Sequence, residues 1–453
     1  MIFFFNFIKN VAMMKTKFCF LLFFIFNQIT IAQQGFQFES NKKKIVIPFK
    51  LINNLVFIPI KVNGVELNFL LDTGVEETIL LSLDDKDQVS FNNVEKITLK
   101  GLGSDEAVEG LKSSNNILSI NGLVDNFHTL YIVLDQNFNF SSHIGIPVNG
   151  IIGYHFFKNN LVEINYDRKK IFVYKDTKKL QEKLHKKFSK TSISIEKNKP
   201  YLETSVTLSE KIIPAKLLID TGNSDALWLF QDINKEIQVP QNNFDDYLGK
   251  GFSGDIFGKR TRISKFSIDK FEFVNPIIAM PEANSFKSVN MVTNRVGSIG
   301  GEILKRFTVL FDYKNNQLFL NKNNNYNAPF HYNMSGIELQ NEGVQWVQET
   351  IALQTQLVED NTYDASGKKA NFKYKFSLKP IYTISNIRKN SPAELSGLKK
   401  DDIVISINNV LGYKYSLQEI NEILKSEEDK WLYFEIERDK QILKFKFQLK
   451  SIL

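Results

Sequence analysis

The feature that most constrains this chain is a triplet that occurs twice, each time directly after an apolar run. Asp72-Thr73-Gly74 follows residues 69–71, and Asp220-Thr221-Gly222 follows residues 217–219, with the two aspartates 148 residues apart (220 − 72). A single copy is readily explained as a tight turn in which the aspartate accepts a hydrogen bond from its own backbone. Roughly 0.06 such triplets are expected by chance in a chain of this length. Two copies, both behind strand-like runs, therefore indicate a duplication.

The two halves of the chain correspond beyond this triplet. Each half has a later glycine-rich segment, KGLGSDEAVEG in the first and GKGFSGDIFGK in the second. Farther on, GIIGYHFFKNNLVEINYDRKKIFVY corresponds to GSIGGEILKRFTVLFDYKNNQLFL, so that Gly153 matches Gly300 at a spacing of 147 residues (300 − 153) and Tyr166 matches Tyr313. The chain thus contains an internal repeat of one structural unit.

Local patterns predict that each unit is built mainly from strands. LVFIPIKVNGVELNFLL has apolar runs on both sides of an Asn-Gly turn, which is typical of a β-hairpin, and LVEINYDRKKIFVY alternates around a polar turn. We expect two homologous all-β lobes, barrels or sandwiches, at residues 33–178 and 191–328. The basic segment between them, residues 179–190, is expected to be a solvated linker or a short helix.

Composition limits the classes of function. The chain has 453 residues, of which 43% are hydrophobic and 24% charged, as in an ordinary globular protein of two or three domains. The net charge is +7, but no arginine-rich patch is interleaved with aromatic residues. Nucleic acid is therefore not an expected partner.

The amino terminus has the pattern of a secretory signal peptide. Three lysines precede the apolar stretch 18–26, and a small-residue cleavage pattern ends at Ala32, before Gln33. We predict a signal peptide over residues 1–32, with Met14 as an alternative start; an uncleaved membrane anchor is the alternative reading.

The single cysteine, Cys19, lies inside this segment. An exported mature chain would then have no disulfide, no catalytic thiol and no thiolate ligand for zinc. We expect a periplasmic or secreted protein without a stable membrane span after cleavage of the signal.

Two further features accompany the duplicated triplets. An apolar-apolar-Gly segment, Ile151-Ile152-Gly153, recurs with one substitution as Ser298-Ile299-Gly300, and glycine-rich hairpin sequences lie between the triplets and these segments. With these features, residues 38–325 resemble the retropepsin and pepsin-like aspartic proteases, with both halves of the active site in one chain. The resemblance implies two lobes related by a pseudo-twofold axis and an aspartic endopeptidase with peptide or protein substrates.

The chemistry of this arrangement explains the residue types. Two carboxylates within hydrogen-bonding reach do not both ionise easily, so Asp72 and Asp220 are expected to share one proton. The ionised member can take a proton from a water that attacks a peptide carbonyl, while the protonated member donates to the carbonyl oxygen. Neither a cofactor nor a metal is expected.

The remaining triplet residues have supporting roles in this interpretation. Thr73 and Thr221 are expected to hydrogen-bond across to the opposite loop, and Gly74 and Gly222 to let the backbone amide approach the carboxylate. The histidines are scattered without metal-ligand spacing, and structural or solvated roles are expected for His128, His143, His155, His185 and His331.

The first triplet departs from the family pattern. Glu76 stands two positions beyond Gly74, where a small or hydroxyl residue is usual, and neither Val75 nor Asn223 has the hydroxyl that pepsin-like enzymes place after the glycine. We predict an acid optimum milder than that of pepsin. An extra acid beside the pair also leaves open a second function, a catalytically inactive scaffold that binds peptides or proteins.

Glycines between strand-like stretches are flap candidates. They are Gly101, Gly103, Gly249, Gly251 and Gly254. They would mark mobile hairpin tips that close over a peptide, or ordinary turns.

The carboxy-terminal region has its own signature. ISNIRKNSPAELSGLKKDDIVISINN resembles a PDZ domain of the bacterial protease-associated kind, which we place at residues 373–453 after a connecting segment, 329–372. Such domains bind a peptide as an added strand beside a helix, here SLQEINEILKS, to recruit or regulate substrates. The groove candidates are Pro380, Ile381 and Tyr382, although Pro380 lacks an amide donor and Asp401 replaces a usual glycine.

Overall fold

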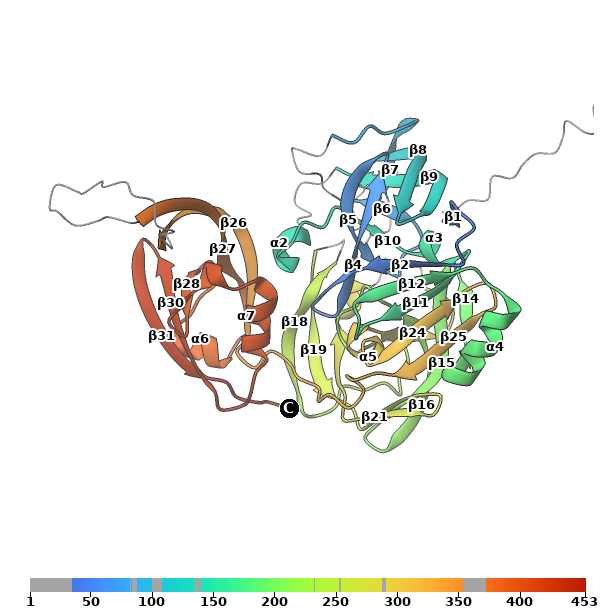
Figure 1. Ribbon diagram of the computed structural model, residues 1–453. Helices are drawn as coiled ribbons and strands as arrows, with labels where there is room; N and C mark the ends of the chain where they lie inside the picture. The colour runs from blue at the N-terminus through green and yellow to red at the C-terminus, as the bar shows by residue number, and fades with distance from the viewer. Residues whose placement is uncertain are drawn as a thin grey trace, which may run out of the picture. The chain divides into compact units, whose positions relative to one another are not determined.

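The computed structural model in Figure 1 describes nine ranges of the chain. They are 35–81, 83, 88–99, 108–134, 140–231, 233–251, 254–286, 291–352 and 372–453. The predicted signal peptide and the flap candidates Gly101 and Gly103 lie outside the described residues. Within the described residues the strands form four sheets, and the chain is mainly β, which confirms the predicted fold class.

The first lobe is built on a nine-stranded sheet. Its order is β1-β9-β6-β10-β5-β4-β8-β7, with β3 paired to β4. The strands are β1 (Gln37–Phe38), β3 (Lys50–Ile52), β4 (Leu55–Val62), β5 (Val65–Leu71), β6 (Thr78–Leu80), β7 (Val94–Leu99), β8 (Val108–Ile120), β9 (Leu123–Val133) and β10 (Gly150–Ile152). Asn63 and Gly64 join β4 to β5 with positive φ angles of 48° and 95°, so the predicted Asn-Gly hairpin is present. Two short helices belong to this lobe, α2 (Phe140–Ile144) and α3 (Tyr154–Phe157).

The second lobe has a ten-stranded sheet of the same plan. Its order is β18-β19-β22-β17-β23-β16-β15-β20-β21, with β14 paired to β15. The strands are β14 (Ser194–Glu196), β15 (Lys199–Leu208), β16 (Lys211–Ile219), β17 (Leu227–Leu229), β18 (Asn243–Gly251), β19 (Gly254–Arg262), β20 (Lys265–Ile268), β21 (Phe271–Val274), β22 (Ile277–Pro281) and β23 (Arg295–Ile299). The helical turns are η1 (Ala283–Ser285) and α5 (Gly301–Leu304).

A six-stranded sheet takes strands from both lobes (Figure 1). Its strands, in order, are β13 (Ser189–Ser192), β25 (Gln317–Lys322), β24 (Phe307–Asp312), β11 (Leu161–Asn165), β12 (Lys170–Tyr174) and β2 (Lys44–Pro48). At its centre Val162 lies opposite Phe311 and Ile164 opposite Val309. With the repeat spacing of 147 residues, Val162 is equivalent to Val309 and Ile164 is equivalent to Phe311. Exchanging the two lobes therefore converts one of these pairs into the other. A pseudo-twofold axis therefore passes between β11 and β24.

One hydrophobic core extends through both lobes. Phe69 and Leu71 of β5, Leu217 of β16, and Phe307 and Phe311 of β24 are all buried in it. Burial of large apolar side chains is the main favourable term in folding, so the two lobes stabilise one another.

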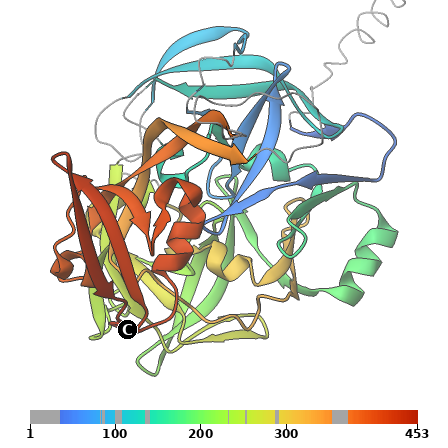
Figure 2. The same cartoon turned by 60° about the vertical axis from the view of Figure 1, so that its left-hand side comes forward.

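The charged segment between the lobes contains a helix rather than a solvated linker. The helix α4 (Lys178–Lys187), green in Figures 1 and 2, begins at Thr177, whose side chain accepts a hydrogen bond from the Leu180 amide. Leu184 of α4 is buried against Phe319 of β25, while the lysines point outward. This apolar contact fixes the helix on the shared sheet.

The C-terminal region forms a separate sheet and core. The sheet has the order β26-β27-β28-β30-β31, with β29 paired to β28. Its elements are β26 (Ile337–Ala352), β27 (Phe372–Ile387), α6 (Pro392–Ser396), β28 (Ile403–Ile407), β29 (Val410–Leu411), η2 (Gly412–Lys414), α7 (Leu417–Leu424), β30 (Trp431–Arg438) and β31 (Gln441–Gln448). A reciprocal capping box of Ser416 and Glu419 begins α7. Asp401 has φ +70°, the left-handed conformation expected where the family pattern has glycine.

The segment 329–372 differs from the sequence prediction. It is not only a connection, because its residues 337–352 form β26, and Tyr332, Ile337 and Leu339 lie in the C-terminal core. β26 pairs along the whole of β27, placing Pro380 opposite Val344.

The predicted groove residues are therefore misplaced. Pro380, Ile381 and Tyr382 lie on β27, an interior strand with β26 on one side and β28 on the other. Tyr382 is buried, and its hydroxyl donates to the Tyr415 carbonyl at 3.0 Å. The sheet edge that can accept a peptide beside α7 is that of β26.

None of the helices in the described ranges is both long enough and apolar enough to cross a membrane.

Candidate active site

The two Asp-Thr-Gly triplets are held by parallel neighbours of equivalent design. Asp72 follows β5, and its amide donates to the Ile152 carbonyl of the parallel strand β10 at 2.8 Å. Asp220 follows β16, and its amide donates to the Ile299 carbonyl of β23 at 2.9 Å. The apolar-apolar-Gly segments therefore position the triplets. Side chains are excluded at Gly153, where a Cβ would lie 2.2 Å from the Asp72 carbonyl oxygen.

The structure brings the two carboxyl groups together between the lobes. A Cβ added to Gly222 would lie 2.3 Å from Cγ of Asp72, and one added to Gly74 would lie 2.9 Å from Oδ1 of Asp220. Each carboxyl thus lies against the glycine of the opposite loop. Each also accepts a hydrogen bond from its own triplet, at 2.7 Å from the Gly74 amide and at 3.0 Å from the Gly222 amide.

The threonines lock the two loops reciprocally. The Thr73 amide donates to Oγ1 of Thr221 and the Thr221 amide donates to Oγ1 of Thr73, both at 3.0 Å. The hydroxyls in turn donate to the main-chain carbonyls of the opposite lobe, Thr73 to Ile219 at 2.6 Å and Thr221 to Leu71 at 2.7 Å. Both threonines are buried. These are the cross-loop hydrogen bonds expected from the sequence.

Burial and mutual repulsion keep a proton on the aspartate pair. Burial, followed by the charge of Asp220, raises the pKa of Asp72 well above its usual range. Burial also raises the pKa of Asp220, while the nearby Arg295 guanidinium opposes this rise. The environment therefore favours a pair that shares one proton, with one aspartate protonated beside one ionised aspartate.

A second, outer pair of contacts joins each lobe to the Asp-Thr-Gly loop of the other. The turn residue Asn54 donates to the Ser224 carbonyl at 2.8 Å, and the equivalent turn residue Asn198 donates to Oε1 of Glu76 at 2.6 Å. Ser224 and Glu76 stand two positions beyond the glycines of their triplets. Glu76 therefore joins the two lobes, a contact that sequence patterns do not reveal because Asn198 is 122 residues away.

The carboxyl pair opens into a cleft of about 810 Å³. The β18–β19 hairpin of the second lobe lines it, with Gly249, Gly251 and Ile256 at the cleft surface and Gly254 at the tip, paired with Gly251. Gly249 and Gly254 have φ of +140° and +110°, which only glycine adopts readily. The described flap candidates thus belong to a hairpin beside the cleft.

A charged network that the sequence did not reveal links the second loop to this hairpin. Arg260 of β19 donates at 2.7 Å both to Oδ1 of Asp225 and to Oδ2 of Asp246 of β18. The indole of Trp228 lines the cleft and donates to Asp225 at 2.8 Å. Arg388 of the C-terminal region also contacts Asp246, at 3.3 Å. The network fixes the base of the hairpin to the residues that follow Asp220.

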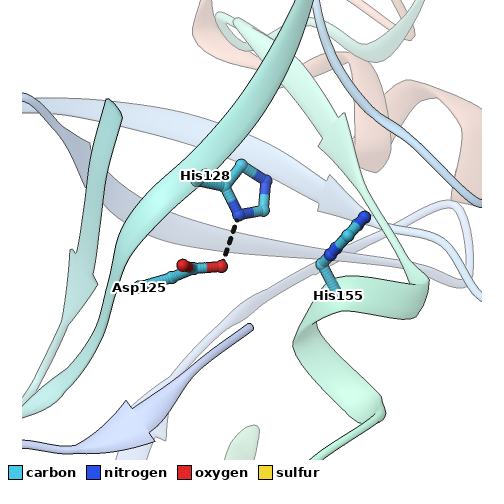
Figure 3. A group of neighbouring side chains, drawn as sticks. All are labelled: Asp125, His128 and His155. Carbon is cyan, nitrogen blue, oxygen red and sulfur yellow. Dashed lines mark hydrogen bonds and ion pairs between the residues drawn. The ribbon is translucent and has the colours of Figure 1, made fainter. Parts of the chain in front are cut away.

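Two of the scattered histidines meet in the first lobe. Nδ1 of His128 is 2.7 Å from Oδ2 of Asp125 (Figure 3). Its Nε2 is 2.7 Å from the Thr78 hydroxyl. His155 lies on α3, and one of its ring nitrogens lies within 4.8 Å of a carboxylate oxygen of Asp125 and of a ring nitrogen of His128. Because both His128 nitrogens are already hydrogen-bonded, the buried cluster fits a structural link between β6 and β9 better than a metal site. His143 and His331 line the cleft, and the side chain of His185 is not described.

Comparison with known families agrees with this geometry. Residues 58–156 match the family model described as aspartyl protease, and residues 383–438 match that of the PDZ domain. The first match lies within the first lobe and includes its Asp-Thr-Gly triplet, and the second lobe corresponds to the first through the internal repeat. The search of curated proteins found no match to the chain.

Proposed function

We propose that this chain, which carries an aspartyl protease domain and a C-terminal PDZ domain, is an aspartic endopeptidase that uses Asp72 and Asp220 to activate water. The observation that carries this proposal is the placement of the two carboxyls against one another, held by reciprocal threonine hydrogen bonds. A scaffold without catalysis has no need of this pair, whose burial and repulsion are unfavourable. Glu76, which suggested such a scaffold, is engaged by Asn198.

The mechanism uses the two protonation states in turn. The ionised aspartate takes a proton from a water whose oxygen attacks the peptide carbonyl carbon, and the protonated aspartate donates its proton to the carbonyl oxygen. Collapse of the tetrahedral intermediate breaks the C–N bond. The aspartate that took the proton from water then passes it to the leaving nitrogen, and the other aspartate regains the proton of the hydroxyl as the new carbonyl forms. No covalent enzyme intermediate is involved.

In this proposal the PDZ domain recruits the substrate to the catalytic cleft. Its edge strand β26 and helix α7 contribute Leu339, Gln418 and Asn421 to the lining of the catalytic cleft. Oε1 of Gln418 also accepts a hydrogen bond from the Asn53 amide of the first lobe at 2.7 Å. A peptide added along β26 would therefore lead toward the aspartate pair.

Export is a further part of the proposal. The lysines and apolar stretch of residues 1–32 support secretion to a periplasmic or extracellular site. Amino-terminal sequencing of the protein recovered outside the cytoplasm tests this. A chain beginning at Gln33 is expected, whereas an intact first residue in the exported fraction would refute cleavage.

The activity is tested with a peptide library incubated with residues 33–453 across a pH series. Wild type is compared with Asp72→Asn and Asp220→Asn, and Asp176→Asn, an exposed acid outside the cleft, is the matched control. Cleavage by wild type and by the control, with each dyad variant inactive, supports the shared-proton mechanism. A folded wild type that cleaves no peptide at any pH would refute the endopeptidase and favour a binding scaffold.

A further inference from the structure

The two walls of the catalytic cleft differ in charge although the lobes are repeats. Lys199 begins β15 directly after the turn residue Asn198, and its equivalent in the first lobe is Leu55, which begins β4 after Asn54. Arg295, four residues before Ile299 on β23, corresponds to Val148, four residues before Ile152. The second lobe thus places two cations at the cleft where the first lobe has aliphatic residues.

These two cations have no carboxylate ion-pair partner among the described residues, since none lies within 4.0 Å of either. Arg295 is 9% exposed as a residue, and its guanidinium donates to the Gly297 carbonyl at 3.1 Å and lies over the Phe230 ring at 5.4 Å. Other shielded cations of this lobe are paired, Arg260 with Asp225 at 2.7 Å and Arg306 with Glu302 at 2.8 Å.

An excess of positive charge follows at the floor of the cleft. The aspartate pair carries one negative charge while it holds its proton, and Lys199 and Arg295 carry two positive charges. Glu76, the next acid, is held by Asn198. Burial and the charge of Arg295 lower the pKa of Lys199, as expected for two neighbouring cations removed from water. Two cations removed from water beside a single negative charge are incompletely compensated, which is unfavourable, so a ligand carboxylate would be stabilised here.

We propose that Lys199 and Arg295 form a subsite for a substrate carboxylate, so that the enzyme prefers peptides with an acidic group beside the scissile bond on the second-lobe side. This inference rests on the proposed endopeptidase function. The stacked rings of Phe230 and Phe286, 4.5 Å apart, give the subsite an apolar wall that strengthens a charge pair by excluding water. The carboxylate comes from a glutamate or aspartate side chain or from the end of the peptide.

The test compares matched peptides with glutamate or glutamine at each position around the cleaved bond. Each peptide is made with a free and with an amidated carboxyl terminus, and kcat/KM is measured for the full mature chain. We expect a preference for glutamate of about tenfold or more at one position, as for a desolvated charge pair. If amidation lowers kcat/KM of the glutamate and glutamine peptides equally, the carboxylate recognised is that of the chain end.

Variants assign the preference to the subsite. Lys199→Met should reduce the glutamate-to-glutamine ratio toward one, Lys199→Glu should favour a lysine peptide, and Lys190→Met, on an exposed face of β13, should keep the ratio. An unchanged ratio in Lys199→Met together with a shifted pH profile would overturn the inference and assign the cations to tuning of the aspartate pair. A wild type that cleaves the glutamate and glutamine peptides equally, and whose cleavage is unchanged by amidation, would also overturn it, while the protease function stands.

Failure of the protease proposal is distinguishable from failure of the subsite. If no peptide is cleaved, fluorescence anisotropy of labelled glutamate and glutamine peptides measures binding to wild type and to Lys199→Met. Tighter binding of the glutamate peptide that is lost in the variant supports the subsite without catalysis. Equal binding of the two peptides refutes it.

Discussion

His155 should make the folded protein sensitive to acid. Its side chain is 17% exposed, its ring lies 5.1 Å from that of His128, and its Nδ1 is buried without a hydrogen-bond partner among the described residues. Burial, then the charge of His128, lowers the pKa of His155 from 6.5 to about 4. Its imidazole is therefore neutral in the folded protein over a range in which the unfolded chain binds a proton.

The sign and size of the effect follow from linkage. Above pH 6.5 the imidazole is neutral in both states, so it has no effect on stability there. As the pH falls from 6.5 toward 4 only the unfolded chain takes up the proton, and the free energy of unfolding falls. The difference between 6.5 and about 4 corresponds to about 3 kcal/mol when fully developed. At pH 4.5 about 2.5 kcal/mol of it should already be lost.

Urea denaturation at pH 7 and at pH 4.5 measures this loss. His155→Gln carries no titratable group, so its decrease in stability between the two pH values should be about 2.5 kcal/mol smaller than that of wild type. His331→Gln, at an exposed histidine, serves as the matched control and should behave like wild type. Parallel decreases in wild type and His155→Gln would refute the reasoning, whatever their absolute stabilities.

Four other outcomes are expected. Because burial raises the pKa of Asp72, ionisation of this carboxyl destabilises the folded state as the pH rises. Asp72→Asn should therefore melt at a higher temperature than wild type at pH 7 and lose this advantage in acid. The same variant should lower kcat/KM by about 10²–10⁴-fold. Thr221→Val removes a buried hydroxyl that accepts from the Thr73 amide and donates to the Leu71 carbonyl, and it should lower the free energy of unfolding by about 1–3 kcal/mol. Thr221→Ser should retain most of this free energy in the same urea titration. Asn198→Ala should lower kcat more than it changes KM in steady-state kinetics, while Glu76→Gln, which keeps an acceptor for Asn198, should keep activity near that of wild type. The pH–rate profile should peak in mildly acidic solution, and a maximum below pH 3 would contradict this.

The sequence located the aspartate pair because its signal is local and repeated. Each triplet follows its own strand, and Gly153 and Gly300 recur at the same spacing, so one half supports the interpretation of the other. The reciprocal threonine bonds followed from the chemistry of two facing loops. The fold class was equally accessible, because Asn-Gly turns and alternating strands are short-range patterns.

Long-range contacts between unlike residues were not accessible. Asn198 and Glu76 meet across the lobes, and Arg260 reaches Asp225 from a different hairpin, yet neither pair forms a motif. The strand β26 was missed for another reason. Much of IELQNEGVQWVQETIA lies on an exposed edge, so its polar residues lack the apolar alternation that marks a strand with one buried face.

The sheet shared by the two lobes has a consequence for how such a site can diversify. Two identical subunits joined across β11 and β24 would form the same carboxyl pair, but any residue at the cleft would then occur twice. One continuous chain removes that constraint, and it keeps the second half at a high effective concentration whatever the protein concentration. Substitutions that make the two lobes unlike can then be retained. An example is Lys199 at the start of β15, where the equivalent residue at the start of β4 is Leu55. A covalently joined pair can recognise a substrate with a direction, whereas a symmetric pair binds either orientation of the peptide equally.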